Sequence, residues 1–379
     1  MKNIKEFNYK ILVESPGRIN LIGEHIDYNG GNVLPAAIDK KILLYFKKNL
    51  DNSTCKVSSL HYNESITFKL SKETKRINSN WKNYIIGVVY YLKKLSGSQL
   101  NGFECMIDSN LPLGSGISSS SALVCGIIKG LNDLFEFKIS KYEMINIAQK
   151  VEHNFIGVKG GIMDQFAIFF GEKDKIILLN CNSLKLKMIN SKFSPYKFLL
   201  LNTNVNHNLS SSDYNKRVNE CKNALKKIKN IDNKLSCLAN ASEDIIINNK
   251  SLFTNNEYKR ALYVSQENQR VLKSTKLIES SNLIEFGKLM YNSHEGLKTL
   301  YEVSCKELDF LVNHSKKYSH ILGSRMMGGG FGGCTINLIK ENYIKPYIKL
   351  VSKKYLNKFS KKLTPIEISI ENGIKTIKK

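Results

Sequence analysis

The distribution of apolar side chains predicts β-strands in both halves of this chain. Short apolar runs bounded by polar residues occupy 41–47, 105–108, 175–180 and 197–203, and residues 334–339 alternate between apolar and polar positions. Short runs of this kind, rich in Ile, Leu and aromatic residues, are typical of buried or half-buried strands.

Helical periodicity marks three further stretches, in which apolar side chains recur mainly at three- or four-residue intervals. Such spacing places them on one face of an α-helix. These positions are Leu123, Ile127, Leu131 and Leu134 within 121–135, Met144, Ile147, Ala148, Val151 and Phe155 within 141–155, and Val218, Cys221, Leu225 and Ile228. Because strands and helices occur in both halves, we predict an α+β fold.

Glycine is distributed unevenly along the chain. Residues 172–286 contain none, whereas the outer parts carry bunches around 17–31, 114–116 and 328–333. We expect the glycine-free middle to be regular and mostly helical. Bunched glycines indicate sharp turns or backbone that approaches a ligand closely.

A domain boundary is predicted near residues 180–196, where Pro195 separates two strand-like runs. The predicted domains are therefore 1–190 and 191–379. A chain of 379 residues is long enough for two domains that each bury a core.

The composition is that of an ordinary globular protein, with 42% hydrophobic residues. No stretch approaches the roughly 20 apolar residues that span a bilayer, and the N-terminus lacks the apolar core of a signal peptide. The eight cysteines are dispersed without a C-x-x-C pair, which favours buried thiols over a disulfide framework or zinc site. We expect a cytoplasmic protein with no membrane partner.

The net charge of +24, from 57 basic and 33 acidic residues, raises the question of a nucleic-acid partner. The excess is mainly lysine, spread along the chain with abundant Asn and Ile, which is the usage that A/T-rich codons produce. Nucleic-acid surfaces more often combine clustered arginines with aromatic residues. We therefore expect no nucleic-acid partner.

The first polar motif is ESPGRINLIGEHIDYNGGNVLPAAID, residues 14–39. It brings Arg18, Glu24, His25 and Asp27 into ten residues between apolar runs. Closely spaced charged donors and acceptors suit bidentate binding of a polyhydroxylated ligand. A solvated surface loop would not explain the apolar flanks, so the motif predicts a ligand site.

The second motif is LPLGSGISSSSAL, residues 111–123, a Gly/Ser loop that runs into the predicted helix. Glycines let the backbone approach phosphate, and the helix start offers unpaired N–H groups and the positive end of its dipole. Serine hydroxyls can add donors or a magnesium ligand. The loop lacks the Gly-Lys-Ser/Thr of a Walker A motif, and a serine-capped helix after a flexible loop is the alternative.

The third motif is GSRMMGGGFGGCTINLI, residues 323–339. Gly328, Gly330 and Gly333 formally satisfy G-x-G-x-x-G, but a strand follows where a dinucleotide site requires a helix. A glycine turn packed against nucleotide phosphates or against the other domain fits better.

Two carboxylates lie in VEHNFIGVKGGIMDQF, residues 151–166. Glu152 closes the predicted 141–155 helix, and Asp164 follows the Gly160-Gly161 pair. Separated by a turn, they can converge on one cleft, where one holds a cation and the other handles a proton.

Taken in order, these motifs resemble those of the galactokinases, within the GHMP superfamily of small-molecule kinases. PGRINLIGEHIDYNGGNVLP looks like the galactokinase-specific N-terminal stretch, and LPLGSGISSSSAL and MGGGFGGC resemble the two superfamily motifs. Residues 151–183, 202–217 and 289–309 are also similar to galactokinases. The resemblance implies a two-domain GHMP kinase fold, with a ribosomal-protein-S5-domain-2-like N-terminal domain, a ferredoxin-like C-terminal domain and the site between them.

The resemblance also implies an activity, the transfer of a phosphoryl group from ATP to the C1 hydroxyl of galactose. Asp164 would take the hydroxyl proton, with Arg18 beside it to favour its ionised form and neutralise the phosphoryl charge. The implied sugar-binding residues are Glu24, His25, Asp27, Gly161 and Tyr214. The implied ATP-binding residues are Gly114, Ser115, Gly116, Ile117, Ser118, Ser119 and Ser120, and the implied Mg²⁺ ligands are Ser120 and Glu152.

Three positions depart from the residues usual in the family: Met327 for threonine, Ser121 for alanine and Lys306 for proline. None of them has an implied catalytic role. An N-acetylgalactosamine kinase would share the same motifs, and a non-catalytic galactose sensor would lose residues from the serine loop, which is intact here. We expect a monomer.

Overall fold

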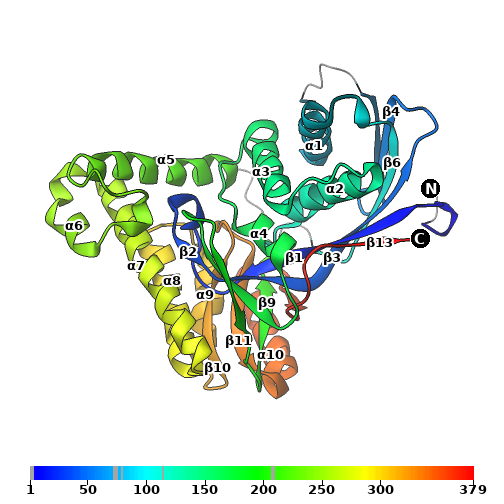
Figure 1. The fold of residues 1–379 in the computed structure, drawn as a ribbon. Helices are drawn as coiled ribbons and strands as arrows, with labels where there is room; N and C mark the ends of the chain where they lie inside the picture. The colour runs from blue at the N-terminus through cyan, green and yellow to red at the C-terminus, as the bar shows by residue number, and fades with distance from the viewer. Residues whose placement is uncertain (1–3, 71–75, 78–79, 113–114, 206–209) are drawn as a thin grey trace.

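The computed structural model describes residues 4–70, 76–77, 80–112, 115–205 and 210–379. The chain forms two lobes, and a long helical arm extends from their junction (Figure 1). The first lobe is built on a mixed sheet covered by helices, and the second on an antiparallel sheet. The predicted α+β architecture is confirmed.

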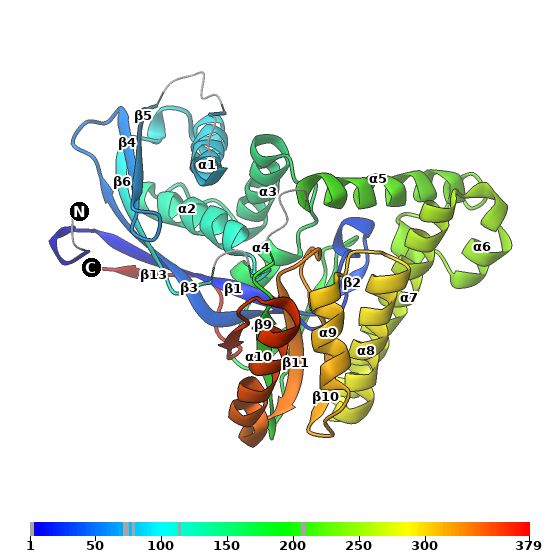
Figure 2. The same ribbon diagram turned by 180° about the vertical axis from the view of Figure 1, so that it is seen from behind.

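The first sheet has six strands in the order β13-β1-β3-β6-β4-β5. All neighbours are antiparallel except β4 and β6, which are parallel. The strands are β1 (Ile11–Asn20), β3 (Pro35–Lys48), β4 (Thr54–Ser59), β5 (Glu64–Lys69), β6 (Phe103–Ser109) and β13 (Lys375–Lys378). The last of these comes from the C-terminal end of the chain and runs along β1 (Figure 2).

Four helices accompany this sheet: α1 (Asn80–Ser96), α2 (Ser119–Phe135), α3 (Lys141–Val151) and α4 (Met163–Phe170). Helix α2 packs closely on β1 and β3, because a Cβ on Gly130 would lie only 2.2 Å from the Phe46 ring and one on Gly126 only 2.4 Å from Leu44. This packing brings the N-terminus of α2 to the edge of the lobe, where the pocket described below lies.

The second lobe contains an antiparallel sheet in the order β10-β11-β9-β12. Its strands are β9 (Tyr196–Asn202), β10 (Ile321–Met327), β11 (Cys334–Lys340) and β12 (Thr364–Glu367). Helices α8 (Leu283–Thr299), α9 (Lys306–Ser315) and α10 (Ile344–Phe359) accompany it. A smaller sheet joins β2 (Asn32–Val33), β7 (Lys175–Asn180) and β8 (Leu186–Asn190).

The helical arm consists of α5 (Ser210–Lys229), α6 (Glu243–Asn248) and α7 (Asn255–Glu279), in the stretch where helices were predicted from the lack of glycine. Short 3₁₀ turns occupy Ile4–Glu6, Asp27–Asn29, Gly97–Gln99, Leu238–Asn240, Lys250–Leu252 and Glu341–Tyr343, and a π-helical turn occupies Glu152–Ile156.

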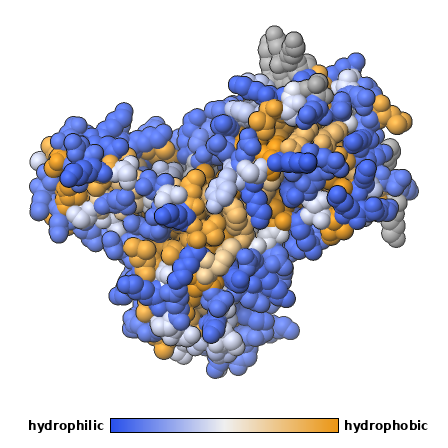
Figure 3. Space-filling model, in the orientation of Figure 1, coloured by the Kyte–Doolittle hydropathy of each residue, from blue (hydrophilic) through white to orange (hydrophobic). Residues whose placement is uncertain are grey.

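One hydrophobic core runs through both lobes and the arm, and a smaller one lies between the second sheet and α10. The face seen in Figure 3 is largely hydrophilic, with apolar residues gathered in the crook where the lobes and the arm meet and over part of the first lobe. All eight cysteines are free, and six of them are buried, as predicted. No helix in the described ranges has the length and hydrophobicity to cross a membrane.

Candidate active site

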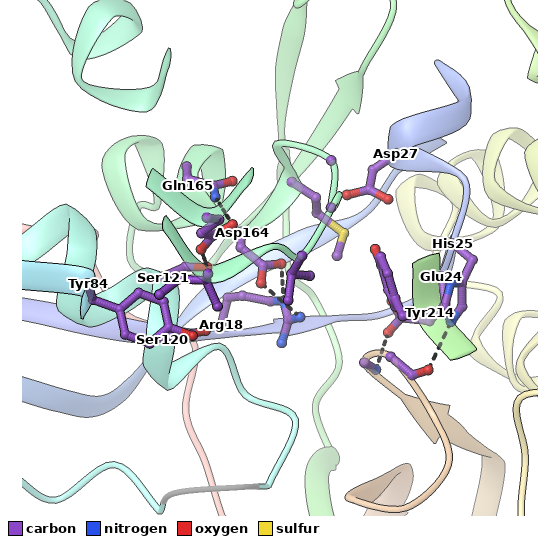
Figure 4. Close-up of a pocket in the computed structure, with 18 residues that line it drawn as sticks. Arg18, Glu24, His25, Asp27, Tyr84, Ser120, Ser121, Asp164, Gln165 and Tyr214 are labelled. Carbon is purple, nitrogen blue, oxygen red and sulfur yellow. Dashed lines mark hydrogen bonds and ion pairs between the residues drawn. The ribbon is translucent and has the colours of Figure 1, made fainter. Parts of the chain in front are cut away.

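A pocket of about 160 Å³ lies at the junction of the two lobes. Nine of the residues singled out in the sequence line it together: Arg18, Glu24, His25, Asp27, Ser120, Glu152, Gly161, Asp164 and Tyr214. Figure 4 shows Asp164, Arg18 and the serines on one side and Glu24, His25, Asp27 and Tyr214 on the other. Segments more than a hundred residues apart in the chain therefore converge on one cavity.

Asp164 and Arg18 form an ion pair on one wall. Arg18 projects from β1 and donates from Nε and Nη2 to the two carboxylate oxygens of Asp164, at 2.8 and 3.2 Å. The hydroxyl of Ser118 donates to the same carboxylate, and Arg18 Nη1 donates to Gly116 O at 2.7 Å. Two residues, Arg18 with two hydrogen bonds and Ser118 with one, thus fix the orientation of the Asp164 carboxylate.

The Arg18 guanidinium keeps its charge in this wall. Burial works against the charged form, but the carboxylates of Asp164, Glu24 and Asp27 together raise the pKa of Arg18. An arginine of this kind can stabilise negative charge that develops in the pocket. The Asp164 side chain remains 24% exposed towards the cavity.

Glu24 lies at the opposite wall and ties the first motif to the third. Its Oε1 accepts hydrogen bonds from Gly328 N at 2.8 Å and from Arg325 Nη2 at 3.1 Å. Arg325 is fully buried and also donates to the backbone carbonyls of Asn20 and Leu21. Arg325 was not among the predicted site residues, although it is the one charged residue of the third motif.

Asp27 lies against the glycine turn before α4. A Cβ on Gly161 would fall 2.1 Å from Asp27 Oδ2 and 2.8 Å from Tyr28 N, so only glycine fits at position 161. Burial, and after it the charge of Asp164, raises the pKa of Asp27 to about 7. Asp27 and Asp164 line the same cavity and influence each other electrostatically.

His25 is held between aromatic rings. Tyr214 from α5 packs at 5.2 Å from the His25 ring centroid, and Tyr301 packs at 4.9 Å on the imidazole as well. Burial lowers the pKa of His25 to about 3, so the ring is neutral. Tyr28 and Tyr301 were not among the predicted site residues.

Of the residues predicted for the serine loop, Ser120 lines the pocket and Gly114 lies outside the described residues. Ser115 donates to Pro112 O, and Ile117 O accepts from Arg18 N. Ser118 adopts a left-handed backbone conformation just before α2, and Ser119 begins that helix. The start of this 17-residue helix, with its unpaired N–H groups, is a suitable place for phosphate.

Glu152 is the second carboxylate in the pocket. It accepts from Ser121 Oγ at 2.6 Å and from Gln165 Nε2 at 2.9 Å. Burial raises the pKa of Glu152 to about 7. In this structure the serine bonded to Glu152 is Ser121, the family departure, while the Ser120 side chain bonds Tyr84.

The oxygens around Glu152 suit a hard cation. Ser120, Ser121 and Glu152 line the same cavity, and Gln165 Oε1 is buried beside them without a protein partner. The described residues contain no group of three or more His, Cys, Asp or Glu that would hold a metal unaided. Mg²⁺ commonly takes one or two protein carboxylates and completes its shell with phosphate oxygens and water, so the donor set fits that ion.

A second hollow of about 220 Å³ adjoins the serine loop. It shares Tyr84 and Ser120 with the first pocket, and it is lined mainly by apolar and aromatic side chains, including Tyr62 and Trp81. The rings of Tyr62 and Trp81 stack at 5.9 Å. Among the residues that line this hollow, the sequence offered only Ser119 and Ser120 as candidates, because the others are scattered over β3, β4, β6, α1, α2 and the turn after β4.

The third motif packs against the second. A Cβ on Gly328 would lie 3.0 Å from Gly116 O, so the two glycine turns touch through their backbones. The predicted packing against the other domain is confirmed, and the dinucleotide interpretation is excluded because β11 follows the turn.

Family models match three parts of the chain. They are described as the galactokinase galactose-binding signature, over residues 4–48, the GHMP kinases N terminal domain, over 83–172, and the GHMP kinases C terminal domain, over 274–344. The two-domain GHMP kinase fold predicted from the sequence is thereby confirmed.

Curated relatives match over the whole length. The chain is 38% identical to a galactokinase of Clostridium acetobutylicum, covering 99% of this chain and 97% of the relative. It is also 38% identical to a galactokinase of Thermosipho africanus, covering 97% of this chain and 99% of the relative.

Solved structures of other proteins share the fold of this chain. Lactococcus lactis galactokinase complexed with galactose superposes with a TM-score of 0.93 and 35% identity, over 97% of this chain and 95% of that one. Methanococcus jannaschii mevalonate kinase shares the fold, with a TM-score of 0.68 and 21% identity over 97% of this chain and 100% of that one.

Proposed function

The chain belongs to the galactokinase family, and on that premise we propose that it transfers the γ-phosphoryl group of ATP to the C1 hydroxyl of D-galactose. The products are galactose 1-phosphate, ADP and a proton. The observation that supports this most is the convergence of the Asp164–Arg18 pair, the serine loop and the Glu24–Asp27 motif on one cavity.

In the proposed reaction Asp164 accepts the proton of the C1 hydroxyl as the O–P bond forms. Its carboxylate is oriented by Arg18 and Ser118. The Arg18 guanidinium offsets the negative charge that gathers on the phosphoryl group. Phosphoryl transfer depends mainly on such positioning and charge neutralisation.

The sugar site is assigned to the opposite wall, with Glu24, His25, Asp27, Gly161 and Tyr214 as its members. The carboxylates of Glu24 and Asp27 accept hydrogen bonds from sugar hydroxyls, and the Tyr214 ring gives a flat apolar surface. Buried acceptors of this kind reject an epimer that leaves them unpaired.

ATP is assigned to the serine loop and the second hollow. The phosphates would lie at the N-terminus of α2, and residues 114–120 would surround them. The aromatic hollow beside Ser120 would hold the adenine, since Tyr62, Trp81 and Tyr84 supply flat apolar surface there.

Mg²⁺ is assigned to Ser120 and Glu152, and when bound it would neutralise charge on the ATP phosphates. Glu152→Gln should raise the Mg²⁺ concentration needed for half-maximal rate, because the amide cannot replace an ionised ligand. Glu143→Gln, which changes an exposed acid on the preceding helix α3, should leave that concentration unchanged. Titrations of rate against Mg²⁺ test this, and equal curves for wild type and Glu152→Gln would remove Glu152 from the metal site.

A coupled assay of ADP release tests the proposed function across galactose, N-acetylgalactosamine, glucose, mevalonate and homoserine. We expect turnover with galactose far above the others. Preferred turnover of N-acetylgalactosamine would reassign the sugar, and galactose binding without ADP release would indicate a sensor. The cytoplasmic location and monomeric state stay predictions.

A further inference from the structure

A chain of hydrogen bonds runs behind the sugar wall and ends at the third glycine motif. It starts at Cys221 on α5 and passes through two tyrosine hydroxyls to the imidazole of His25. The contacts are Cys221 Sγ to Tyr301 Oη at 3.1 Å, Tyr301 Oη to Tyr28 Oη at 2.8 Å, Tyr28 Oη to His25 Nδ1 at 2.7 Å, and His25 Nε2 to Gly329 O at 3.1 Å.

The last contact sets the direction of the whole chain. The carbonyl of Gly329 can only accept, so His25 Nε2 must carry the hydrogen. The ring is neutral, as its lowered pKa of about 3 shows, so Nδ1 is an acceptor and the Tyr28 hydroxyl donates to it. Tyr28 then accepts from Tyr301, and Tyr301 accepts from the Cys221 thiol.

His25 is constrained in other ways too. Its backbone φ is +62°, a left-handed conformation that few residues other than glycine adopt. Asn29 Nδ2 donates a hydrogen bond to the backbone carbonyl of His25 at 2.8 Å. Its ring lies against those of Tyr214 and Tyr301. The surroundings therefore determine both the place and the tautomer of this imidazole.

Both ring nitrogens of His25 are used by the protein itself. A sugar hydroxyl could bind one of them only by displacing Tyr28 or Gly329. Beside Gly329, the Gly328 N–H donates to Glu24 Oε1 at 2.8 Å. A shift of Gly329 would therefore move a donor that orients Glu24.

We propose that His25 is a positioning residue: its Nε2–H holds the glycine turn at Gly329 against the first motif, and the Tyr28 hydroxyl, itself bonded to Tyr301, donates to Nδ1 and keeps the ring in that place. Glu24 is thereby oriented towards the sugar. The effect of His25 on galactose binding rests on the proposed function, whereas the tautomer of the His25 ring does not. The Asp164–Arg18 pair, on the opposite wall, makes none of these contacts.

The first test reads the tautomer directly. Long-range ¹H–¹⁵N correlation spectra of the full-length protein, labelled with ¹⁵N-histidine, distinguish a protonated ring nitrogen from a bare one, and His25→Gln assigns the signals. We expect Nε2 protonated and Nδ1 bare, both before and after saturation with galactose. A protonated Nδ1, or a tautomer change on adding galactose, would overturn the proposal.

The second test uses Tyr28→Phe and Tyr301→Phe, with Tyr291→Phe as the control. Tyr291 also has a hydrogen-bonded hydroxyl, to Ser315 Oγ at 3.1 Å, but does not line the pocket. Tyr28→Phe leaves Nδ1 without a hydrogen-bond donor, so the Nδ1 ¹⁵N signal should move downfield, towards that of an unbonded bare nitrogen, while Nε2 stays protonated. Galactose KM should rise by roughly 10-fold, with kcat within about threefold of wild type, because a buried acceptor is left unsatisfied.

Tyr301→Phe should cause smaller changes in the same direction, and Tyr291→Phe none. An unchanged His25 spectrum in folded Tyr28→Phe would overturn the role of the tyrosines. If wild type fails to phosphorylate galactose, the proposed function fails, yet the spectra still decide the tautomer.

Discussion

Asp164 is held by groups from three parts of the chain, β1, the serine loop and its own helix α4. Removing proton transfer typically costs about 10²–10⁴-fold in rate. Asp164→Asn should therefore fold normally and lose most of its kcat. Arg18→Ala should also lose turnover, because the phosphoryl charge is then not offset.

The two losses should not add in the double variant, since both residues serve one event of proton and charge transfer. The measurement is kcat for the single and double variants, with thermal melts to confirm folding. Asp133→Asn is a matched control, since Asp133 is ion-paired with Lys129 away from the pocket. Turnover near wild type in folded Asp164→Asn would contradict the mechanism and leave the sugar site standing.

The neighbouring glycines 160 and 161 differ in what a methyl group would meet. At Gly161 it would meet the Asp27 carboxylate and Tyr28 N, whereas at Gly160 its nearest neighbour is Tyr214 Oη at 3.7 Å. Gly161→Ala should displace Asp27 and raise galactose KM by roughly 10-fold or more. Gly160→Ala should stay within about threefold of wild type. Equal KM values for the two variants would show that Asp27 does not contact the sugar.

At the scale of elements, α7 supports the sugar motif through one buried acid. Glu267 Oε1 accepts from Gly23 N at 3.0 Å and from Ser293 Oγ at 2.6 Å, and Oε2 accepts from Arg270. The Glu267 side chain is 0% exposed. It thereby links α7, α8 and the loop after β1.

Glu267→Gln should destabilise the protein by about 1–3 kcal/mol, because one of the donors that Glu267 now satisfies, Gly23 N–H or Arg270 Nε–H, loses its acceptor. Galactose KM should rise as well. Glu279→Gln is the control on the same helix, since Glu279 forms an exposed pair with Lys187 that is worth less than about 1 kcal/mol. Urea unfolding and initial rates measure both effects, and equal midpoints for the two variants would contradict the support assigned to Glu267.

Elements with regular patterns were predicted closely. The strand expected at 175–180 is β7, and the one at 197–203 is β9, shifted by one residue. The helix expected at 121–135 begins two residues earlier. The 141–155 helix changes after Val151 into a π-helical turn, which shares the apolar spacing and so could not be distinguished in the sequence.

Strand β1 was not predicted, for a physical reason. Its sequence contains Pro16 and Gly17, which indicate a turn, whereas the strand accommodates them by a register shift between Pro16 and Arg18. The polar residues within 18–27 and the acids Glu152 and Asp164 stood out in the sequence itself, whereas Tyr214 and the role of Gly161 entered only through the resemblance to the galactokinases. Arg325, Glu267 and Tyr301 were missed because their partners lie far away in the sequence.

At the scale of the whole molecule, the two lobes do not correspond to two continuous stretches of the chain. Strand β13 returns from the second lobe and pairs with β1, and Thr376 Oγ1 donates to Asp133 at the end of α2. The hydrophobic core is shared as well. The division into domains 1–190 and 191–379 stays a prediction from the sequence, because β13, near the C-terminus, belongs to the sheet of the first lobe.

The pocket exists only because the lobes are joined in this way. Arg18, Glu152 and Asp164 come from the first lobe, whereas Tyr214 and the Gly328 turn come from the second half of the chain. We therefore place the phosphorylation of galactose at C1 in this shared cavity.

The most direct measurement follows the reaction of the full-length protein with ATP, Mg²⁺ and galactose by ³¹P NMR. The account predicts that galactose 1-phosphate and ADP appear in equal amounts in wild type, and that folded Asp164→Asn forms them at least about 10²-fold more slowly. Glucose in place of galactose should give little product. The proposed function would be contradicted if the phosphate appeared on another hydroxyl of galactose, if galactose and glucose had equal kcat/KM, or if no galactose-dependent product formed.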